Sequence, residues 1–149
     1  MISVRSIAVA DPAFDQACAL FDAYRVHYGQ MAAPQRTRQW LGQQLDRQRF
    51  RVAIASLDDK VCGLITTSVI PASLTLRTAW LIRDLYVDPA QRRSGAARAL
   101  LLHVIEMARA EGALRLSLQT EPDNTAALSL YGSLGFTRVD DLVALNLIC

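Results

Sequence analysis

The chain has 149 residues, of which 52% are hydrophobic and 20% are charged, and its formal net charge is +2. This composition excludes a disordered chain and gives one domain enough apolar surface to form a core. The small net charge does not favour nucleic-acid binding, and no stretch reaches the roughly 18 apolar residues that a membrane-spanning helix needs. We therefore expect a single domain over residues 1–149, with no nucleic-acid or membrane partner.

The N-terminus and the cysteines indicate an intracellular protein. Residues 1–15 contain no basic leader and no cleavage site, and their pattern is typical of a strand. Cys18, Cys62 and Cys149 are an odd number of cysteines without CxxC spacing, which supports neither a disulfide framework nor a zinc site. We expect a cytoplasmic protein without a metal.

Hydrophobic periodicity and turn signals predict the first elements. Alternation predicts a strand over residues 2–10, and Asp11 followed by Pro12 is a helix-start signal for a helix that runs to about residue 28. Pro34 opens a second helix that ends near residue 48, with Trp40 and Leu41 on its inward stripe. Two strands, residues 49–57 and 61–70, then form a hairpin.

The second half continues with a run over residues 74–87 that is too long for one flat strand, so we expect a bend or bulge in it. Helical spacing follows up to Gly112, and residues 113–120 are predicted as a strand. A helix over residues 124–134 and two paired strands, 136–140 and 142–148, complete the order β α α β β β α β α β β.

The segment PAQRRSGAARALL, residues 89–101, has the composition of an anion site. Amide groups at the start of a helix, together with the helix dipole, favour a phosphate. The segment supplies three arginines, a serine able to cap a helix and a glycine that lets the backbone come close: Arg92, Arg93, Arg98, Ser94 and Gly95. It is neither a P-loop nor a GxGxxG turn. A solvated helix start with ordinary surface arginines is the alternative.

A second cluster lies in NTAALSLYGSLGF, residues 124–136, and here the sequence resembles a known family, the GCN5-related N-acetyltransferases (GNAT). Residues 92–97, RRSGAA, are similar to the Arg/Gln-x-x-Gly-x-Gly/Ala coenzyme A loop of that family. Residues 124–136 are similar to its Asn-x-x-Ala-x-x-x-Tyr-x-x-x-Gly-Phe unit. The resemblance covers nearly the whole chain in element order.

The resemblance implies an α/β (α+β) fold, with a central mixed, mostly antiparallel sheet of six to seven strands flanked by about four helices. It also implies an enzyme that moves an acetyl group from acetyl-CoA, its cosubstrate, to a primary amine of a small molecule or peptide by direct attack in a ternary complex. Transfer of another acyl group and a non-catalytic acyl-CoA-binding or sensing module are the alternatives. Relatives are often dimers, so a homodimer is also expected.

The resemblance assigns cofactor contacts residue by residue. The strand that pairs with the pantetheine arm corresponds to Leu85, Tyr86 and Val87, and the pyrophosphate loop corresponds to Arg92, Arg93, Ser94, Gly95, Ala96, Ala97 and Arg98. Asn124 and Ala127 correspond to contacts in the pantetheine region. Tyr131 corresponds to the tyrosine that protonates the leaving thiolate, and a phenol is protonated at neutral pH and able to do so. The alternative for Tyr131 is a core aromatic.

Deprotonation of the amine requires an acceptor for a proton, and the sequence offers two carboxylates near the expected cleft. Asp84 and Glu121 both stand at strand positions. Asp84 acts on the amine directly, through water, or only as a structural hydrogen-bond acceptor, and these alternatives stay open.

The acceptor pocket is expected near the end of the first predicted helix, where Tyr24, His27 and Tyr28 lie. Arg83 stands where polyamine-acetylating relatives carry an acidic residue, which argues against a polyamine substrate. Arginines on the second predicted helix and at its exit add positive charge: Arg36, Arg38, Arg47, Arg49 and Arg51. This charge favours an amine that also carries a carboxylate or phosphate, unless the arginines are only solvated.

Overall fold

The computed structural model describes all of residues 1–149, which form two compact units, Met1–Gln119 and Thr120–Cys149. The first unit contains one sheet of five strands in the order β1-β2-β3-β4-β5. These strands are β1 (Ile2–Ile7), β2 (Arg51–Leu57), β3 (Lys60–Ala72), β4 (Arg77–Val87) and β5 (Leu116–Ser117). Neighbours from β1 to β4 are antiparallel and β5 is parallel to β4, which confirms the mixed, mostly antiparallel sheet.

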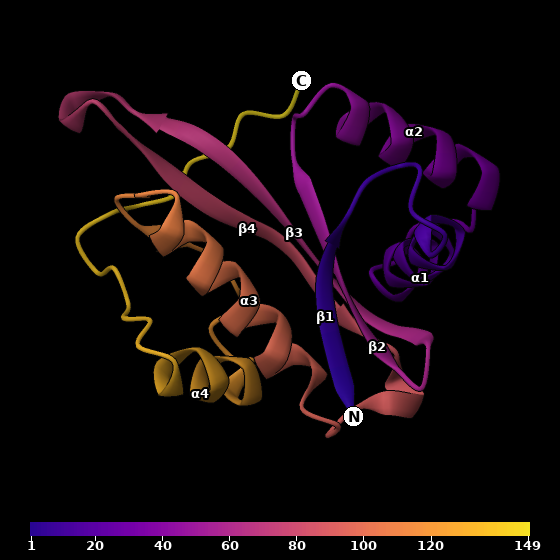
Figure 1. Cartoon of the computed structure of the whole chain (residues 1–149). Helices are drawn as coiled ribbons and strands as arrows, with labels where there is room; N and C mark the ends of the chain where they lie inside the picture. Colours follow the sequence, from indigo (N-terminus) through magenta and orange to yellow (C-terminus); the bar gives the residue numbers. More distant parts are fainter. The chain divides into compact units, whose positions relative to one another are not determined.

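Helices cover both faces of this sheet (Figure 1). Helices α1 (Phe14–His27) and α2 (Pro34–Asp46) pack on one face, and α3 (Ala96–Ala110) packs on the other. The element order agrees with the prediction through α4 (Thr125–Ser133), which belongs to the second unit.

A buried carboxylate fixes the connection between α1 and α2. Asp22 accepts hydrogen bonds from the Thr37 hydroxyl at 2.7 Å, from the Arg25 guanidinium at 2.8 Å and from the Ala33 amide at 3.2 Å. Asp22 is 7% exposed, and these donors compensate for the loss of water around its charge. The start of α2 at Pro34, as predicted, is therefore held against the end of α1.

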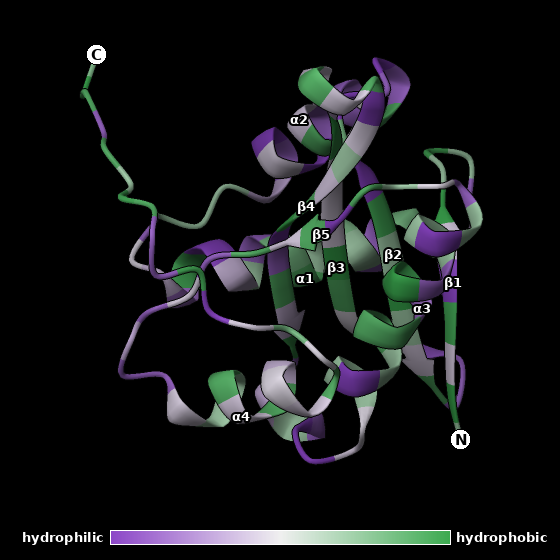
Figure 2. Cartoon of the chain, turned by 90° about the vertical axis from the view of Figure 1, so that its left-hand side faces the viewer, coloured by the Kyte–Doolittle hydropathy of each residue, from purple (hydrophilic) through white to green (hydrophobic).

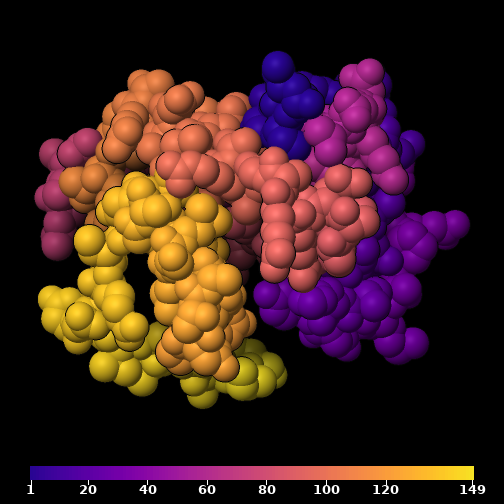
Figure 3. All heavy atoms as spheres, turned by 90° about the horizontal axis from the view of Figure 1, so that it is seen from below, coloured from indigo at the N-terminus to yellow at the C-terminus, as the bar shows by residue number.

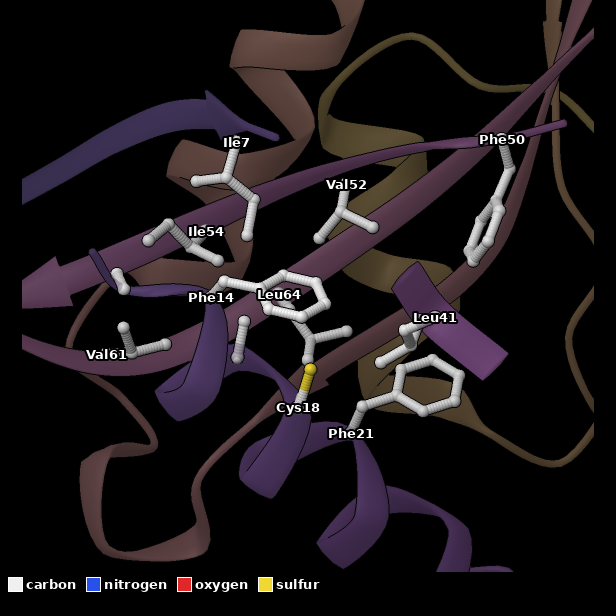
Figure 4. Packing of buried hydrophobic residues seen from close by; sticks show 12 residues of the cluster. Ile7, Phe14, Cys18, Phe21, Leu41, Phe50, Val52, Ile54, Val61 and Leu64 are labelled. Atoms are coloured by element: carbon white, nitrogen blue, oxygen red, sulfur yellow. The ribbon is translucent and has the colours of Figure 1, made fainter. Parts of the chain in front are cut away.

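The core of the first unit lies between α1, α2 and the sheet (Figure 4). Phe14, Cys18 and Phe21 of α1 pack over Ile54 and Leu64, the latter two being only 0% and 1% exposed. The middle parts of β2 and β3 are correspondingly hydrophobic (Figure 2).

The second predicted helix is correct at its start but not in its buried stripe. Leu41 is buried as predicted, whereas Trp40 is 47% exposed. Consecutive helix positions point in different directions, so the two side chains do not both face the sheet. Trp40 lies instead against the rings of Phe21 and Phe50.

The predicted irregularity in the long strand is a β-bulge. The β3–β4 register shifts between Thr66 and Thr67, which face Asp84 and Ile82 respectively. Arg83 is thus the extra residue. A bulge re-aims side chains on the strand that carries it.

The second unit contains α4 and the C-terminal segment. The Asn124 side chain caps α4 by accepting a hydrogen bond from the Ala127 amide at 3.3 Å, and Gly135 follows the helix with φ +97°. The two strands predicted over residues 136–148 do not form, and this prediction was wrong for the structure. Their apolar side chains remain exposed, for example Leu145 at 88%. Alternation describes which side chains a strand would bury, but a strand requires a hydrogen-bonded neighbour, and this segment has none.

Candidate functional site

One edge of β4 is open over its last residues. β5 pairs with β4 only at Trp80 and Leu81, so residues 82–87 have a strand neighbour on the β3 side alone. Leu85, Tyr86 and Val87 pair there with Ile65, Leu64 and Gly63. Their backbone groups on the other side are available to an extended ligand, as in strand addition.

The chain leaves this edge through a short turn that leads into α3. Asp88 accepts a hydrogen bond from the Ala90 amide at 3.0 Å, which closes the turn Pro89–Gln91. Arg93 and Gly95 then adopt left-handed conformations, with φ of +65° and +86°, before α3 begins at Ala96. In Figure 3 the segment between β4 and α3, coloured salmon, lies at the surface of the first unit.

The start of α3 offers unsatisfied donors. Gly95 is the N-cap, and no side chain caps the helix, so the capping role expected of Ser94 is not found. The first amides of a helix have no partner within the helix. The Ser94 hydroxyl is also buried without a hydrogen-bond partner, and an added side chain at Gly95 would meet no atom within 4 Å. These features suit a bound anion with several oxygen atoms.

Asp84, directly before the open edge, is held by two donors from other elements. The Tyr24 hydroxyl donates to its Oδ1 at 2.8 Å, and the Thr66 hydroxyl donates to its Oδ2. Burial and the neighbouring carboxylate raise the pKa of Tyr24 well above its usual value. Tyr24 therefore stays protonated and orients Asp84 through its O–H.

Asp84 also lines a pocket of about 360 Å³ that is built from α1, α2, β3 and β4. This volume lies within the range of small-molecule sites. Its lining residues are Phe21, Trp40, Gln44, Arg49, Phe50, Ser68, Arg83 and Asp84. A second cavity, inside the core, has a volume of only about 10 Å³, which leaves no room for a ligand.

The residues predicted for acceptor binding divide into two groups. Arg83 lines the pocket. Tyr24, His27 and Tyr28 do not, but they form an aromatic cluster with Tyr86 of β4, with ring centroids 5.1 to 6.0 Å apart. Within this cluster Tyr24 contacts Asp84, through its hydroxyl.

Five lining residues are not among the predicted site residues: Phe21, Trp40, Gln44, Phe50 and Ser68. They come from four segments of the chain, and no local motif connects them. In the structure, Trp40 differs from an ordinary core residue only in the exposure of its aromatic side chain on α2.

The remaining predicted residues lie in the second unit. Asn124 and Ala127 are joined by the helix cap, and the Tyr131 ring packs against Phe136 with centroids 5.9 Å apart. Glu121 lies in the turn before α4, where its carbonyl accepts from the Asn124 amide, and its side chain is exposed. The roles assigned to these residues remain predictions.

Other chemistries find little support among the side chains. Burial raises the pKa of the Cys18 thiol to about 11 and also raises that of Cys62, so neither is a thiolate nucleophile at neutral pH. No group of three or more His, Cys, Asp or Glu side chains is arranged to hold a metal ion. None of the helices has the length and apolar character needed to cross a membrane.

The chain is similar in sequence to several acetyltransferases. Residues 14–136 match the family model described as acetyltransferase (GNAT) family. The uncharacterized N-acetyltransferase YhfO of Bacillus subtilis (strain 168) is 31% identical over 78% of each chain. The ribosomal protein bS18-alanine N-acetyltransferase of Salmonella typhimurium is 30% identical over 78% of this chain and 73% of its own. A mycothiol acetyltransferase of Kocuria rhizophila is 37% identical over 62% of this chain, which spans only 31% of that relative's length.

Solved structures share the fold over the whole chain. The crystal structure of a probable acetyltransferase superposes with a TM-score of 0.88 at 28% identity, covering 100% of this chain and 97% of the other. An aminoglycoside acetyltransferase, meta-AAC0020, from an uncultured soil metagenomic sample superposes with a TM-score of 0.82 at 23% identity, covering 99% and 96%. At that identity the second likeness concerns the fold alone.

Proposed function

Because the chain belongs to the acetyltransferase (GNAT) family, we propose that it transfers an acetyl group from acetyl-CoA to a primary amine of a small molecule or peptide. The observation that carries this proposal is the continuity of the open edge of β4 with the uncapped start of α3. An extended, amide-containing arm that ends in a diphosphate fits such a path. Acetyl-CoA has this shape and supplies the acetyl thioester.

The residues of the loop fit the pyrophosphate end of this molecule. The amides at the start of α3 and the Ser94 hydroxyl donate to phosphate oxygens, and Gly95 leaves space for them. Arg92, Arg93 and Arg98 supply positive charge around the loop. The backbone of Leu85, Tyr86 and Val87 pairs with the pantetheine arm, whose amides complete hydrogen bonds that β5 does not make.

Asp84 is placed to handle the amine. Its carboxylate attracts the ammonium form of the acceptor, and an oxygen of this carboxylate takes the proton directly or through a water molecule. The amine nitrogen then attacks the thioester carbonyl and forms the carbon–nitrogen bond, the carbon–sulfur bond breaks, and the nitrogen loses its extra proton to solvent. The departing sulfur requires one proton. On this proposal Tyr131 donates that proton, and Asn124 and Ala127 contact the pantetheine region, as the family resemblance implies.

The experiment is steady-state release of the coenzyme A thiol by the purified chain across a panel of amines, with acetyl-CoA and with a longer acyl-CoA. The proposal expects saturable, amine-dependent thiol release that is fastest with acetyl-CoA. Tight coenzyme A binding without amine-dependent release would instead identify a binding or sensing module. Faster release from the longer donor would identify another acyl transferase.

Two further expectations from the resemblance accompany the proposal. A homodimer is tested by sedimentation of the purified chain. A cytoplasmic location is tested by fractionation of the cells that produce it.

A further inference from the structure

We propose that the pocket between α1, α2 and β4 selects an acceptor that carries a carboxylate and an apolar side chain beside its amine, as an amino acid or short peptide does. The inference rests on the proposed function, because it concerns the amine that this pocket presents for acetylation.

Two arginines in the pocket have no partner in the protein. Arg49 and Arg83 both line it, and neither side chain forms an ion pair or a hydrogen bond. Three other arginines nearby in sequence are neutralised: Arg25 by Asp22, Arg38 by Asp15 and Arg51 by Glu111. The positive charge expected around the second helix is therefore available in the pocket mainly from Arg49 and Arg83.

The pocket also contains one carboxylate, that of Asp84, against the two arginines. Asp84 is oriented by Tyr24 and Thr66, which leaves its other lone pairs to an ammonium group. A ligand that matches this arrangement carries a positive amine and a negative group at once. A polyamine would bring a second cation toward the arginines, which is unfavourable.

Backbone features hold the charged residues at these positions. Arg83 and Asp84 are consecutive residues, and with the β-bulge at Arg83 both of them line the same pocket. At the end of α2, Gln48 has φ +53°, and this left-handed residue turns the chain so that Arg49 and Phe50 both line the pocket. The two cations therefore come from positions that the fold specifies.

An aromatic wall completes the pocket. The Trp40 ring lies 6.3 Å from that of Phe21 and 5.7 Å from that of Phe50, and Figure 4 shows Phe21 and Phe50 on either side of Leu41. Trp40 is 47% exposed, so a large apolar area faces the solvent at this site. An apolar side chain on the acceptor would cover it.

A matched pair of acceptors tests the inference. The dipeptide Ala-Phe and its C-terminal amide have the same amine and the same apolar side chain, and differ in the carboxylate. We expect kcat/KM for thiol release to be at least about fivefold higher for the acid, as expected for a partly exposed charge-assisted contact. Arg49→Gln and Arg83→Gln should each bring this ratio toward one. Arg47→Gln, an exposed arginine that does not line the pocket, should leave the ratio unchanged.

Binding is measured separately from catalysis through Trp40. Trp80 is 1% exposed, so a change of tryptophan fluorescence on adding Ala-Phe reports Trp40, and Trp40→Phe should abolish it. The titration is made with and without coenzyme A. A fluorescence response to the acid, without thiol release from any amine of the panel, would refute the proposed function and retain the inference that the pocket binds such a molecule.

Three results would overturn the inference while leaving the proposed function intact. The first is an amide that is acetylated as well as the acid by the wild-type chain. The second is a preference for the acid that survives both Arg49→Gln and Arg83→Gln. A fluorescence titration with no response to either dipeptide would also overturn it.

Discussion

Replacing Gly95 by aspartate separates cofactor binding from folding. Gly95 has φ +86°, and an added Cβ would meet no atom within 4 Å, so the new side chain enters open space. The left-handed backbone costs about 1–2 kcal/mol for most residues and less for aspartate or asparagine. A negative charge at the start of α3 stabilises the helix by about 0.3–1 kcal/mol. We therefore expect the free energy of unfolding to fall by no more than about 1 kcal/mol.

The effect on coenzyme A should be much larger. If the carboxylate lies about 5 Å from the nearest phosphate charge, repulsion at the effective dielectric constant of a protein surface amounts to about 3 kcal/mol. That energy corresponds to a loss of about a hundredfold in affinity. The carboxylate also competes with the phosphate for the free amides of α3.

Isothermal titration calorimetry with coenzyme A measures this loss, and thermal unfolding confirms that the variant is folded. Gly95→Asn is the matched control, because asparagine makes the same demand on the backbone without the charge and should lose much less affinity. A folded Gly95→Asp variant that binds coenzyme A within about threefold of the wild type would refute the phosphate loop.

Three other changes are expected to have distinct effects. Tyr131→Phe should keep coenzyme A affinity and lower kcat by about 10²–10⁴-fold, the typical share of a general acid, and an unchanged kcat would leave Tyr131 as a packing residue. Arg83→Glu should shift the ratio of kcat/KM toward spermidine over Ala-Phe; if spermidine is already the best acceptor of the wild type, the charge argument fails. Asp22→Ala should lower the free energy of unfolding by about 2–4 kcal/mol, because Thr37 and Arg25 lose their acceptor. The hydrogen bond from Thr37 lowers the pKa of Asp22, so this stabilisation should be complete above about pH 4 and lost as the pH falls through the folded-state pKa, which urea unfolding at neutral and acidic pH measures.

Local features with a strict backbone requirement were predictable from the sequence. The loop before α3 combines glycine with arginines, and the structure gives it the left-handed Gly95 and the free helix start that such a segment needs. The long run over residues 74–87 exceeds what a flat strand accommodates, and it contains the bulge at Arg83. Both features were predictable because each depends on residues that lie close together in the sequence.

The pocket was less predictable, because its walls come from distant segments. Periodicity shows that Leu41 faces the core, but it does not show that Trp40 meets Phe21 and Phe50 at the edge of the helix. Alternation over residues 142–148 similarly gives the pattern of a strand without the neighbour that would pair with it. Contacts between distant segments decide both cases.

The most direct measurement is product analysis by mass spectrometry after the wild-type chain is incubated with acetyl-CoA and Ala-Phe. The account predicts that each released coenzyme A thiol is matched by one acetyl group on the dipeptide amine, with no acetyl group left on the protein. Acetyl-CoA that binds but yields no acetylated amine, with this dipeptide or with any amine of the panel, would contradict it.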